Sequence, residues 1–231
     1  MFTVESIKKV VNLMNKTRKT FEKMPVENIP LCISTGNNKI GKTLNVSLPP
    51  ILTCANCKEC KMYCYDIKAC LQYPNTVINA RIRNLVILQK DRNEYFNRIE
   101  KRIQRRKLNK AFRWHVAGDI VDYDYFDRMV TIATNHPDWI FWTYTKNYPI
   151  VNEWIRNHGE TKENLPKNLS VMFSEWKGLP MVNPYNMPVF SVFFDGDELP
   201  ENAYICPGNC DICLKTGRGC PNKENGFVHD H

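Results

Sequence analysis

The chain has 231 residues, of which 43% are hydrophobic and 24% charged, and this composition excludes a disordered protein while allowing one domain with an ordinary core. No apolar run approaches the roughly 18 residues of a membrane-spanning helix, so we expect a cytoplasmic protein without membrane contact. The net charge of +8 is concentrated between residues 81 and 113, which indicates either a solvated helix face or a surface for an anionic partner.

The N-terminal part, residues 1–50, predicts a helix followed by a β-hairpin. Residues 3–24 have a basic amphipathic pattern without the apolar core of a signal peptide. The string GNNKIGKT at 36–43 matches the P-loop pattern, but a P-loop needs a helix that begins at its Lys-Thr. Residues 42–50 instead alternate apolar and polar positions and end in Pro-Pro, which is a strand pattern. We therefore predict a hairpin turn and no phosphate site.

Ten cysteines in a chain without an export signal favour metal binding over disulfides. The first cysteine group, at 54–70, comprises Cys54, Cys57, Cys60, Cys64 and Cys70. Its first four members have the spacing C-x2-C-x2-C-x3-C, in which successive thiolates of bacterial ferredoxins bind one [4Fe–4S] cluster. One departure from that pattern is Tyr65, which stands where ferredoxins have proline.

The α/β core at 74–200 shows helical and strand patterns in alternation. Helices are predicted at 74–90, 91–108, 124–137 and 148–159, and strands at 111–118, 138–145, 168–176 and 188–196. Such units imply a parallel sheet covered by helices. About four such strands are too few for an eight-stranded barrel. We therefore predict a single α/β domain over 1–231, with a partial (β/α) barrel or a small parallel sheet and metal-binding segments near both ends.

The second cysteine group, at 206–220, comprises Cys206, Cys210, Cys213 and Cys220. Its C-x3-C-x2-C spacing is that of radical S-adenosylmethionine enzymes. In those enzymes the motif follows the first barrel strand, whereas here it lies near the C-terminus. The auxiliary clusters found at the end of such enzymes are therefore the closer match. We expect one or two [4Fe–4S] clusters, with the two groups close together near the strand ends and S-adenosylmethionine as a candidate cofactor. Zinc is the alternative, for example held by Cys54 and Cys57 together with Cys210 and Cys213.

Polar residues follow the predicted strands at their carboxyl ends, where parallel sheets bind ligands. Four are candidate catalytic groups: His115, Asp119, Lys146 and Glu175. Four more are candidate contacts to a cofactor: Gly118, Thr143, Tyr144 and Ser174. They predict a site for a small molecule or nucleotide. The alternative is that strand ends are polar because they reach water, and that His115 is a hydrogen-bonded core residue.

The basic stretch offers a different function. If the metal is purely structural, a nucleic-acid surface is expected on the helix at 91–108 and its end, with Arg102, Arg105 and Arg106 as contacts to phosphates. A zinc-stabilised protein that binds a partner without catalysis is a further alternative.

Several strings together resemble the gene product 88 domain proteins of bacteriophages and prophages: GNNKIGK, SLPP, CYDIKA, FRWHVAGDIVD, FWTYTK and CPGNCDIC. The resemblance runs from about residue 36 to residue 220. It implies a phage origin and a location in the host cytoplasm, and it implies no reaction. The family's N-x-K-x-G element would cover 37–41, which supports a structural role for the P-loop-like string. Combined with the cysteine spacing, these features lead us to expect an iron–sulfur protein that acts as a redox or radical-type enzyme.

Overall fold

The computed structural model describes residues 1–54 and 56–230. Its helices are α1 (Val4–Glu22), α2 (Tyr65–Gln72), α3 (Asn79–Lys90), α4 (Arg92–Gln104), α5 (Tyr123–Asn135), α6 (Tyr148–Asn157) and α7 (Cys210–Thr216). Its strands are β1 (Ile33–Ser34), β2 (Leu44–Val46), β3 (Ala111–Trp114), β4 (Ile140–Thr145), β5 (Leu169–Glu175), β6 (Val189–Phe193) and β7 (Gly226–His229). Each predicted helix and strand is present with shifted ends.

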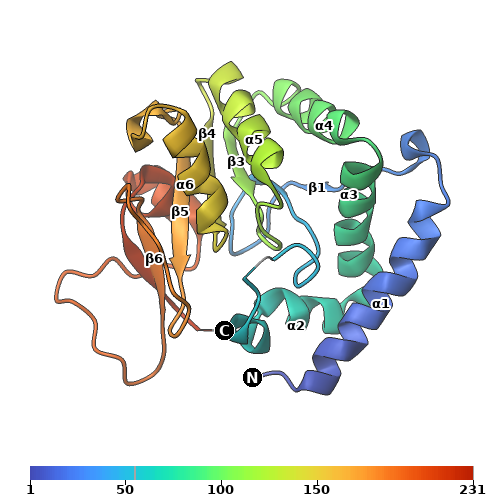
Figure 1. Cartoon of the computed structure of the whole chain (residues 1–231), viewed down its shortest axis with the longest axis horizontal. Helices are drawn as coiled ribbons and strands as arrows, with labels where there is room; N and C mark the ends of the chain where they lie inside the picture. Colours follow the sequence, from blue (N-terminus) through green and yellow to red (C-terminus); the bar gives the residue numbers. More distant parts are fainter. Residues whose placement is uncertain (55, 231) are drawn as a thin grey trace.

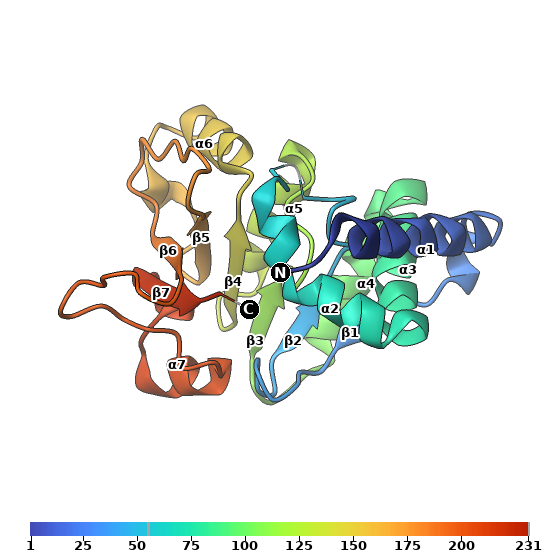
Figure 2. The same ribbon diagram turned by 90° about the horizontal axis from the view of Figure 1, so that it is seen from below.

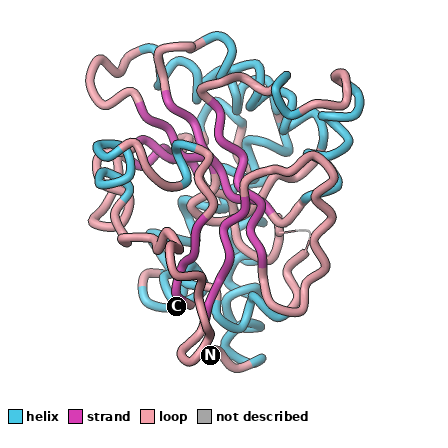
Figure 3. Tube along the Cα trace, turned by 90° about the vertical axis from the view of Figure 1, so that its left-hand side faces the viewer, coloured by secondary structure: helices cyan, strands magenta, loops and turns pink. Residues whose placement is uncertain are grey.

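The strands form one sheet in the order β1-β2-β3-β4-β5-β6-β7, the same as their order along the chain. Strand β1 is antiparallel to β2, and every later neighbour pair is parallel. Figure 3 shows the strands crossing the molecule as one twisted set with helices around them. The predicted α/β class with a small, mainly parallel sheet is therefore confirmed, with more parallel strands than expected.

The two faces of the sheet have different covers. Along β4, Phe141 belongs to the large core formed with the helices, whereas Trp142 packs in a second cluster with residues of the C-terminal segment. This follows from the alternation of side chains along a strand. Helices α5 and α6 lie in front of the strands in Figure 1, and α7 lies on the opposite side from them in Figure 2. We call the α7 side the inner face.

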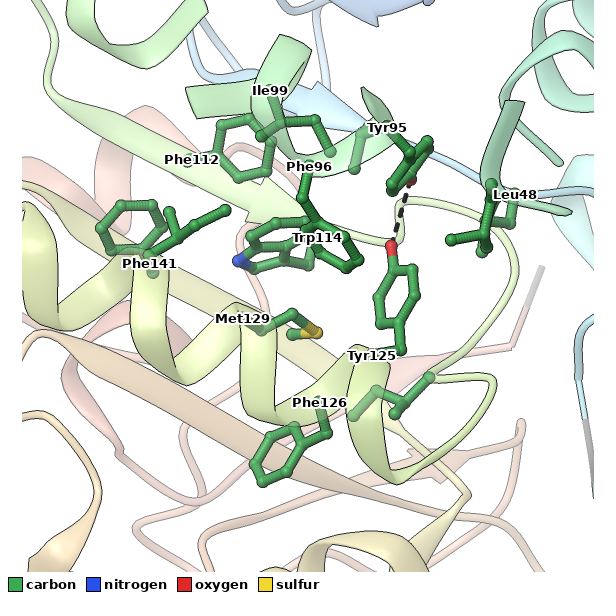
Figure 4. Packing of buried hydrophobic residues seen from close by; sticks show 14 of the residues in the cluster. Leu48, Tyr95, Phe96, Ile99, Phe112, Trp114, Tyr125, Phe126, Met129 and Phe141 are labelled. Atoms are coloured by element: carbon green, nitrogen blue, oxygen red, sulfur yellow. Dashed lines mark hydrogen bonds between the residues drawn. The ribbon is translucent and has the colours of Figure 1, made fainter. Parts of the chain in front are cut away.

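The large core is dominated by aromatic side chains from β3, α4 and α5. Trp114 and Phe112 are fully buried, with ring centroids 4.8 Å apart. Phe96 packs edge-on against Tyr125 at 4.9 Å, and the Tyr125 hydroxyl is hydrogen-bonded to that of Tyr95 at 3.1 Å (Figure 4). Such rings contribute most of the buried apolar area and fix the position of β3 relative to the helices.

The P-loop-like string is a hairpin, as predicted. Asn37 forms an antiparallel bridge with Gly41, and its side-chain oxygen accepts hydrogen bonds from the Lys39 and Ile40 amides at 2.9 and 3.1 Å. Strand β2 begins at Leu44, so no helix starts at the Lys-Thr pair. This hairpin contacts α7, because the Lys39 carbonyl oxygen accepts from the Cys210 amide at 3.0 Å.

Three elements were not predicted: α2, α7 and β7. Helices α2 and α7 have only 8 and 7 residues, too few to show a clear helical period, and they overlap the cysteine groups that suggested metal loops. Strand β7 has 4 residues and begins with glycine. In the described part of the chain, none of the helices is both long enough and apolar enough to traverse a lipid bilayer.

Candidate metal and ligand site at the strand ends

The first cysteine group lies across the carboxyl ends of the parallel strands. The Asn56 side-chain amide donates to the Lys146 carbonyl oxygen, next to the end of β4, at 2.5 Å. The Tyr63 ring lies 5.6 Å from both Trp176, after β5, and Phe194, after β6. The strand ends point toward the edge where α2 lies in Figure 1. The predicted placement of this group at the strand ends is therefore observed.

Cys57 lies within hydrogen-bonding reach of both Cys54 and Cys60. Hydrogen bonds with Cys54 and Cys60 raise the pKa of Cys57 well above its usual range. The same bond from Cys57, assisted by the positive charge of Lys146, lowers the pKa of Cys60 to about 6 against the effect of burial. These interactions favour the thiolate form at Cys60, the form that binds metals. We call Cys54, Cys57 and Cys60 the three-sulfur set.

The other two members of the group are more deeply placed. Burial raises the pKa of Cys64 to about 12, with a small contribution from nearby Cys54. Cys70 is fully buried in α2, and its thiol lies 4.0 Å from a carboxylate oxygen of Asp66. Asp66 is in turn paired with Arg81 at 2.9 Å. Both were predicted as metal ligands, and Cys64 is the one that lies near Cys54.

Three of the predicted polar residues meet beside these thiols. Asp119 is 5% exposed and accepts hydrogen bonds from the Thr145 hydroxyl at 2.6 Å and from the Lys146 amide at 2.9 Å. The ammonium group of Lys146 donates to the Ser174 hydroxyl at 2.9 Å and lies 5.7 Å from the Trp176 ring centroid. Burial raises the pKa of Asp119, while these hydrogen bonds oppose the rise. We call Asp119, Lys146 and Ser174 the rim set.

His115 and Thr143 are not at the rim but inside the helix-covered core. His115 is 3% exposed, with Nδ1 3.3 Å from the Thr143 hydroxyl and Nε2 3.0 Å from the Tyr125 hydroxyl. Burial, with a contribution from the charge of Arg113, lowers the pKa of His115 to about 3. The structure therefore agrees with the alternative of a hydrogen-bonded core histidine.

Gly118 has a packing role at the end of β3. Its φ of +82° is in the region that favours glycine, and a Cβ there would lie 2.7 Å from the Leu48 Cβ and 2.8 Å from the Thr53 hydroxyl. Gly118 thus lets β3 end against the segment that leads into the first cysteine group. Glu175 is exposed and is hydrogen-bonded to Ser191, so it lies at the outer side of the rim.

The second cysteine group lies at the opposite, amino ends of the strands. Cys210 and Cys220 pack on the inner face with Ala111 and Trp142, which stand at or near the first residues of β3 and β4. The Cys220 carbonyl oxygen accepts from Ser170, near the start of β5, at 2.5 Å. The expectation that the two groups lie close together at one rim is therefore wrong, because the C-terminal segment crosses the inner face instead.

Side chains of the inner face surround the second group. Tyr144, predicted as a rim residue, points here and is hydrogen-bonded to Cys220. Burial raises the pKa of Cys220 to about 12. The Tyr204 hydroxyl lies 3.0 Å from the Cys213 sulfur, and Arg113 donates to the Cys210 sulfur at 3.9 Å. Three thiols of this group, those of Cys210, Cys213 and Cys220, are buried, whereas every member of the first group except Cys70 is partly exposed.

Much of the basic stretch is used inside the molecule. Arg106 donates to the backbone carbonyl oxygen of Lys42 at 2.5 Å and to that of Leu108 at 2.9 Å, so it attaches the end of α4 to the hairpin. Arg102 and Arg105 are exposed and form no ion pair within the described residues. The three arginines predicted to contact phosphates thus divide into one structural and two surface residues.

Whether the cysteine groups fit a metal depends on their donor atoms. Among residues 1–54 and 56–230, no three His, Cys, Asp or Glu side chains are arranged as a ready metal site. The first group nevertheless supplies three neighbouring sulfurs and the second supplies four, and thiolates are the ligands that iron–sulfur clusters and structural zinc use. The chemistry of both donor sets therefore fits such a group.

Two hollows in the surface are lined by other residues. One, of about 620 Å³, is lined by residues of α1 and α3 together with Leu52, Thr53 and Val121. The other, of about 420 Å³, lies beside the start of β5 and includes Leu169, Val171 and Lys223. Neither lining includes a cysteine or a residue of the rim set.

Sequence reasoning missed Arg113, although a signal was present. Phe112 and Trp114 on either side of it are apolar and face the helices, so the alternation along β3 places Arg113 on the inner face. A charged residue in the middle of a covered parallel strand is unusual and indicates a special environment. Tyr204 and Asn56 carried no comparable signal, because their partners come from distant segments.

The comparisons with known proteins identify a family. A model of the gene product 88 family matches residues 13–179, well over half of the chain, including the hairpin, the first cysteine group and the rim set. The second cysteine group lies beyond the matched residues. No curated protein and no solved structure matches the chain. The chain belongs to the gene product 88 family.

Proposed function

We propose that this phage-family protein binds an iron–sulfur cluster at Cys54, Cys57 and Cys60 and uses it in redox or radical chemistry on a small molecule or nucleotide. The observation that carries the proposal is the position of the three-sulfur set, at the carboxyl ends of the parallel strands beside Lys146. A cluster held by three thiolates keeps one iron available for a further ligand, either Cys64 or a cofactor such as S-adenosylmethionine.

The neighbouring side chains support a ligand site rather than a purely structural cluster. Lys146 places a cation next to the thiols and is oriented by Ser174 and Trp176. Such a cation can bind a carboxylate or phosphate of a ligand. The sequential parallel sheet with helices on its outer face fits our proposal of a partial (β/α) barrel, in which ligands lie at this end.

The first test is iron and acid-labile sulfide content, with a visible spectrum, on protein purified without oxygen. In a background that lacks the second group (Cys206→Ser, Cys210→Ser, Cys213→Ser, Cys220→Ser), we expect about four irons and four sulfides per chain. Cys57→Ser in that background should abolish the sulfur-to-iron absorption, because Cys57 is the central thiol of the set.

Cys32→Ser is the matched control, since Cys32 lies outside both groups and its backbone is bonded to Asn84. It should leave iron and sulfide unchanged. A colourless protein that holds zinc at the first group would refute the iron–sulfur proposal and favour a structural metal. Retention of the full absorption by Cys57→Ser would refute the ligand assignment.

A second candidate function, nucleic-acid binding, is favoured by one observation. The end of α4 and the residues after it expose Lys101, Arg102, Arg105 and Lys107 without ion pairs inside the described chain. If they contact phosphates, the double variant Arg102→Glu, Arg105→Glu should weaken binding to single-stranded DNA or RNA. It should also reduce the slope of log binding constant against log salt concentration by about 2, which is roughly one unit for each phosphate contact removed.

A charge reversal elsewhere provides the comparison. Lys8→Glu with Lys9→Glu makes the same change of charge on the exposed side of α1. Equal loss of binding in both double variants would indicate an effect of net charge alone. Binding that does not respond to salt would exclude this candidate.

A further inference from the structure

The inner face contains a half-buried cation that has no carboxylate partner within the described residues. Arg113 projects from the middle of β3, its Nε is buried, and no hydrogen-bond partner for that atom lies in the described part of the chain. Its guanidinium donates to the Cys210 sulfur at 3.9 Å and lies 5.1 Å from the Tyr144 ring centroid. Within the described residues, the salt bridges of the protein do not include Arg113. Because the Nε donor is shielded from water and has no partner, a negative charge beside this guanidinium would stabilise it.

Three thiols of the second group each have a polar donor directed at them. Arg113 bonds to Cys210, Tyr204 lies 3.0 Å from the Cys213 sulfur, and Tyr144 bonds to Cys220. Donors that point at sulfur stabilise the thiolate rather than the thiol. This is also how outer residues orient and tune metal-bound cysteines.

We propose that Cys206, Cys210, Cys213 and Cys220 together form a closed tetrathiolate metal centre, and that Arg113 is its counter-ion. Four thiolates around a zinc ion, or around a [4Fe–4S] cluster in its oxidised state, carry a net double negative charge. The single positive charge of Arg113 would offset half of that charge. The centre is separate from the three-sulfur set, so this proposal does not depend on whether the first group binds a cluster.

The competing interpretation treats these cysteines as small apolar residues of the core. Free cysteines are often buried in that way. This interpretation explains the low exposure of Cys210, Cys213 and Cys220, but it leaves the buried Nε of Arg113 beside neutral thiols and phenols. A metal centre explains the burial of these three thiols and the position of the guanidinium with one cause.

The position of the centre suits a structural role. The Cys210 amide donates to the hairpin at Lys39, and the Asp211 carboxylate accepts from the Lys42 amide at 3.2 Å. The metal would join the loop around Cys206, the start of α7 and the turn at Cys220 into one unit on the inner face. Such a centre has no open coordination position and supplies stability rather than reactivity.

The test uses the full chain with Cys54, Cys57 and Cys60 all replaced by Ser, so that any remaining metal belongs to the second group. After anaerobic purification we expect either about one zinc, or about four irons with sulfide, per chain. Cys213→Ser in this background should lower the metal content at least tenfold, and Cys32→Ser should not. Absence of metal after incubation with zinc, and separately with iron and sulfide, would overturn the proposal.

The counter-ion role is tested by Arg113→Met and Arg113→Lys in the same background. Competition with a chromophoric chelator should show about 10- to 100-fold weaker metal retention for the methionine variant, and near-normal retention for the lysine variant, which keeps the charge. If Arg113→Met does not fold, Tyr204→Phe removes another donor from a less buried position and should weaken retention several-fold. Unchanged retention in every folded variant would overturn the role of the outer donors.

Discussion

Asp119→Ala is expected to lower the free energy of unfolding by about 4 kcal/mol. The carboxylate of Asp119 accepts from the Thr145 hydroxyl at 2.6 Å, the Ile120 amide at 2.7 Å and the Lys146 amide at 2.9 Å. Its removal leaves these donors without a partner at a buried site, and each buried unpaired donor costs about 1–3 kcal/mol. Because Lys146 also contacts Asn56, we expect metal loading at the first cysteine group to fall as well.

Urea denaturation at pH 7 measures the loss. Asp119→Asn keeps the shape and one acceptor oxygen, so its loss should be smaller than that of Asp119→Ala. Asp138→Ala is the surface control, since Asp138 is exposed and its ion pair is with the exposed Lys110, and it should leave stability nearly unchanged. A loss below about 1 kcal/mol for Asp119→Ala would contradict the view that this carboxylate anchors the rim.

The protein is also expected to lose about 4 kcal/mol of stability between pH 6.5 and pH 3, because of His115 alone. Burial lowers the pKa of His115 in the folded protein to about 3, below the usual value of 6.5 that applies in the unfolded chain. Between these two values the unfolded chain binds a proton that the folded protein does not. Stability is therefore full above about pH 6.5 and decreases as the pH falls.

His115→Gln should remove this part of the acid loss. The variant is expected to be less stable than the parent at pH 7, since the bonds to Thr143 and Tyr125 are altered, but its stability should fall less steeply below pH 6.5. His229→Gln, a change at a half-exposed histidine, should keep the steep fall. Parallel stability profiles for His115→Gln and the parent would contradict the buried neutral state of His115.

The fold was predictable to the extent that long periodic segments determine it. The apolar period of residues 74–108 predicted two helices, and the patterns from residue 111 onward predicted four strands of the parallel sheet. The strand pattern after Thr43 showed that the match to a P-loop was accidental. The number of parallel strands was underestimated, because β7 is short and β2 was assigned to an isolated hairpin.

The candidate site was only partly predictable, since small backbone changes decide where a side chain points. Alternation along β3 would place His115 on the face opposite to Trp114 and away from the helices. Its φ of +52° breaks that alternation, and the ring enters the helix-covered core instead. Likewise, the segment from Cys206 to Cys220 lies on the inner face because it contacts the hairpin, about 170 positions earlier in the chain. No local sequence pattern predicts such a distant contact.

The contact of the first cysteine group with the ends of β4 to β6 also sets an order of events during synthesis. Asn56 and Tyr63 leave the ribosome well before Lys146, Trp176 and Phe194, their partners in the folded protein. At ordinary rates of translation this interval is roughly ten seconds, during which the strands that the first cysteine group contacts have not yet been synthesised. If the first cysteine group binds a metal, as we propose, the loop reaches its final shape for the metal only after most of the chain has been made. Until then its cysteines stand in a segment whose folded partners do not yet exist.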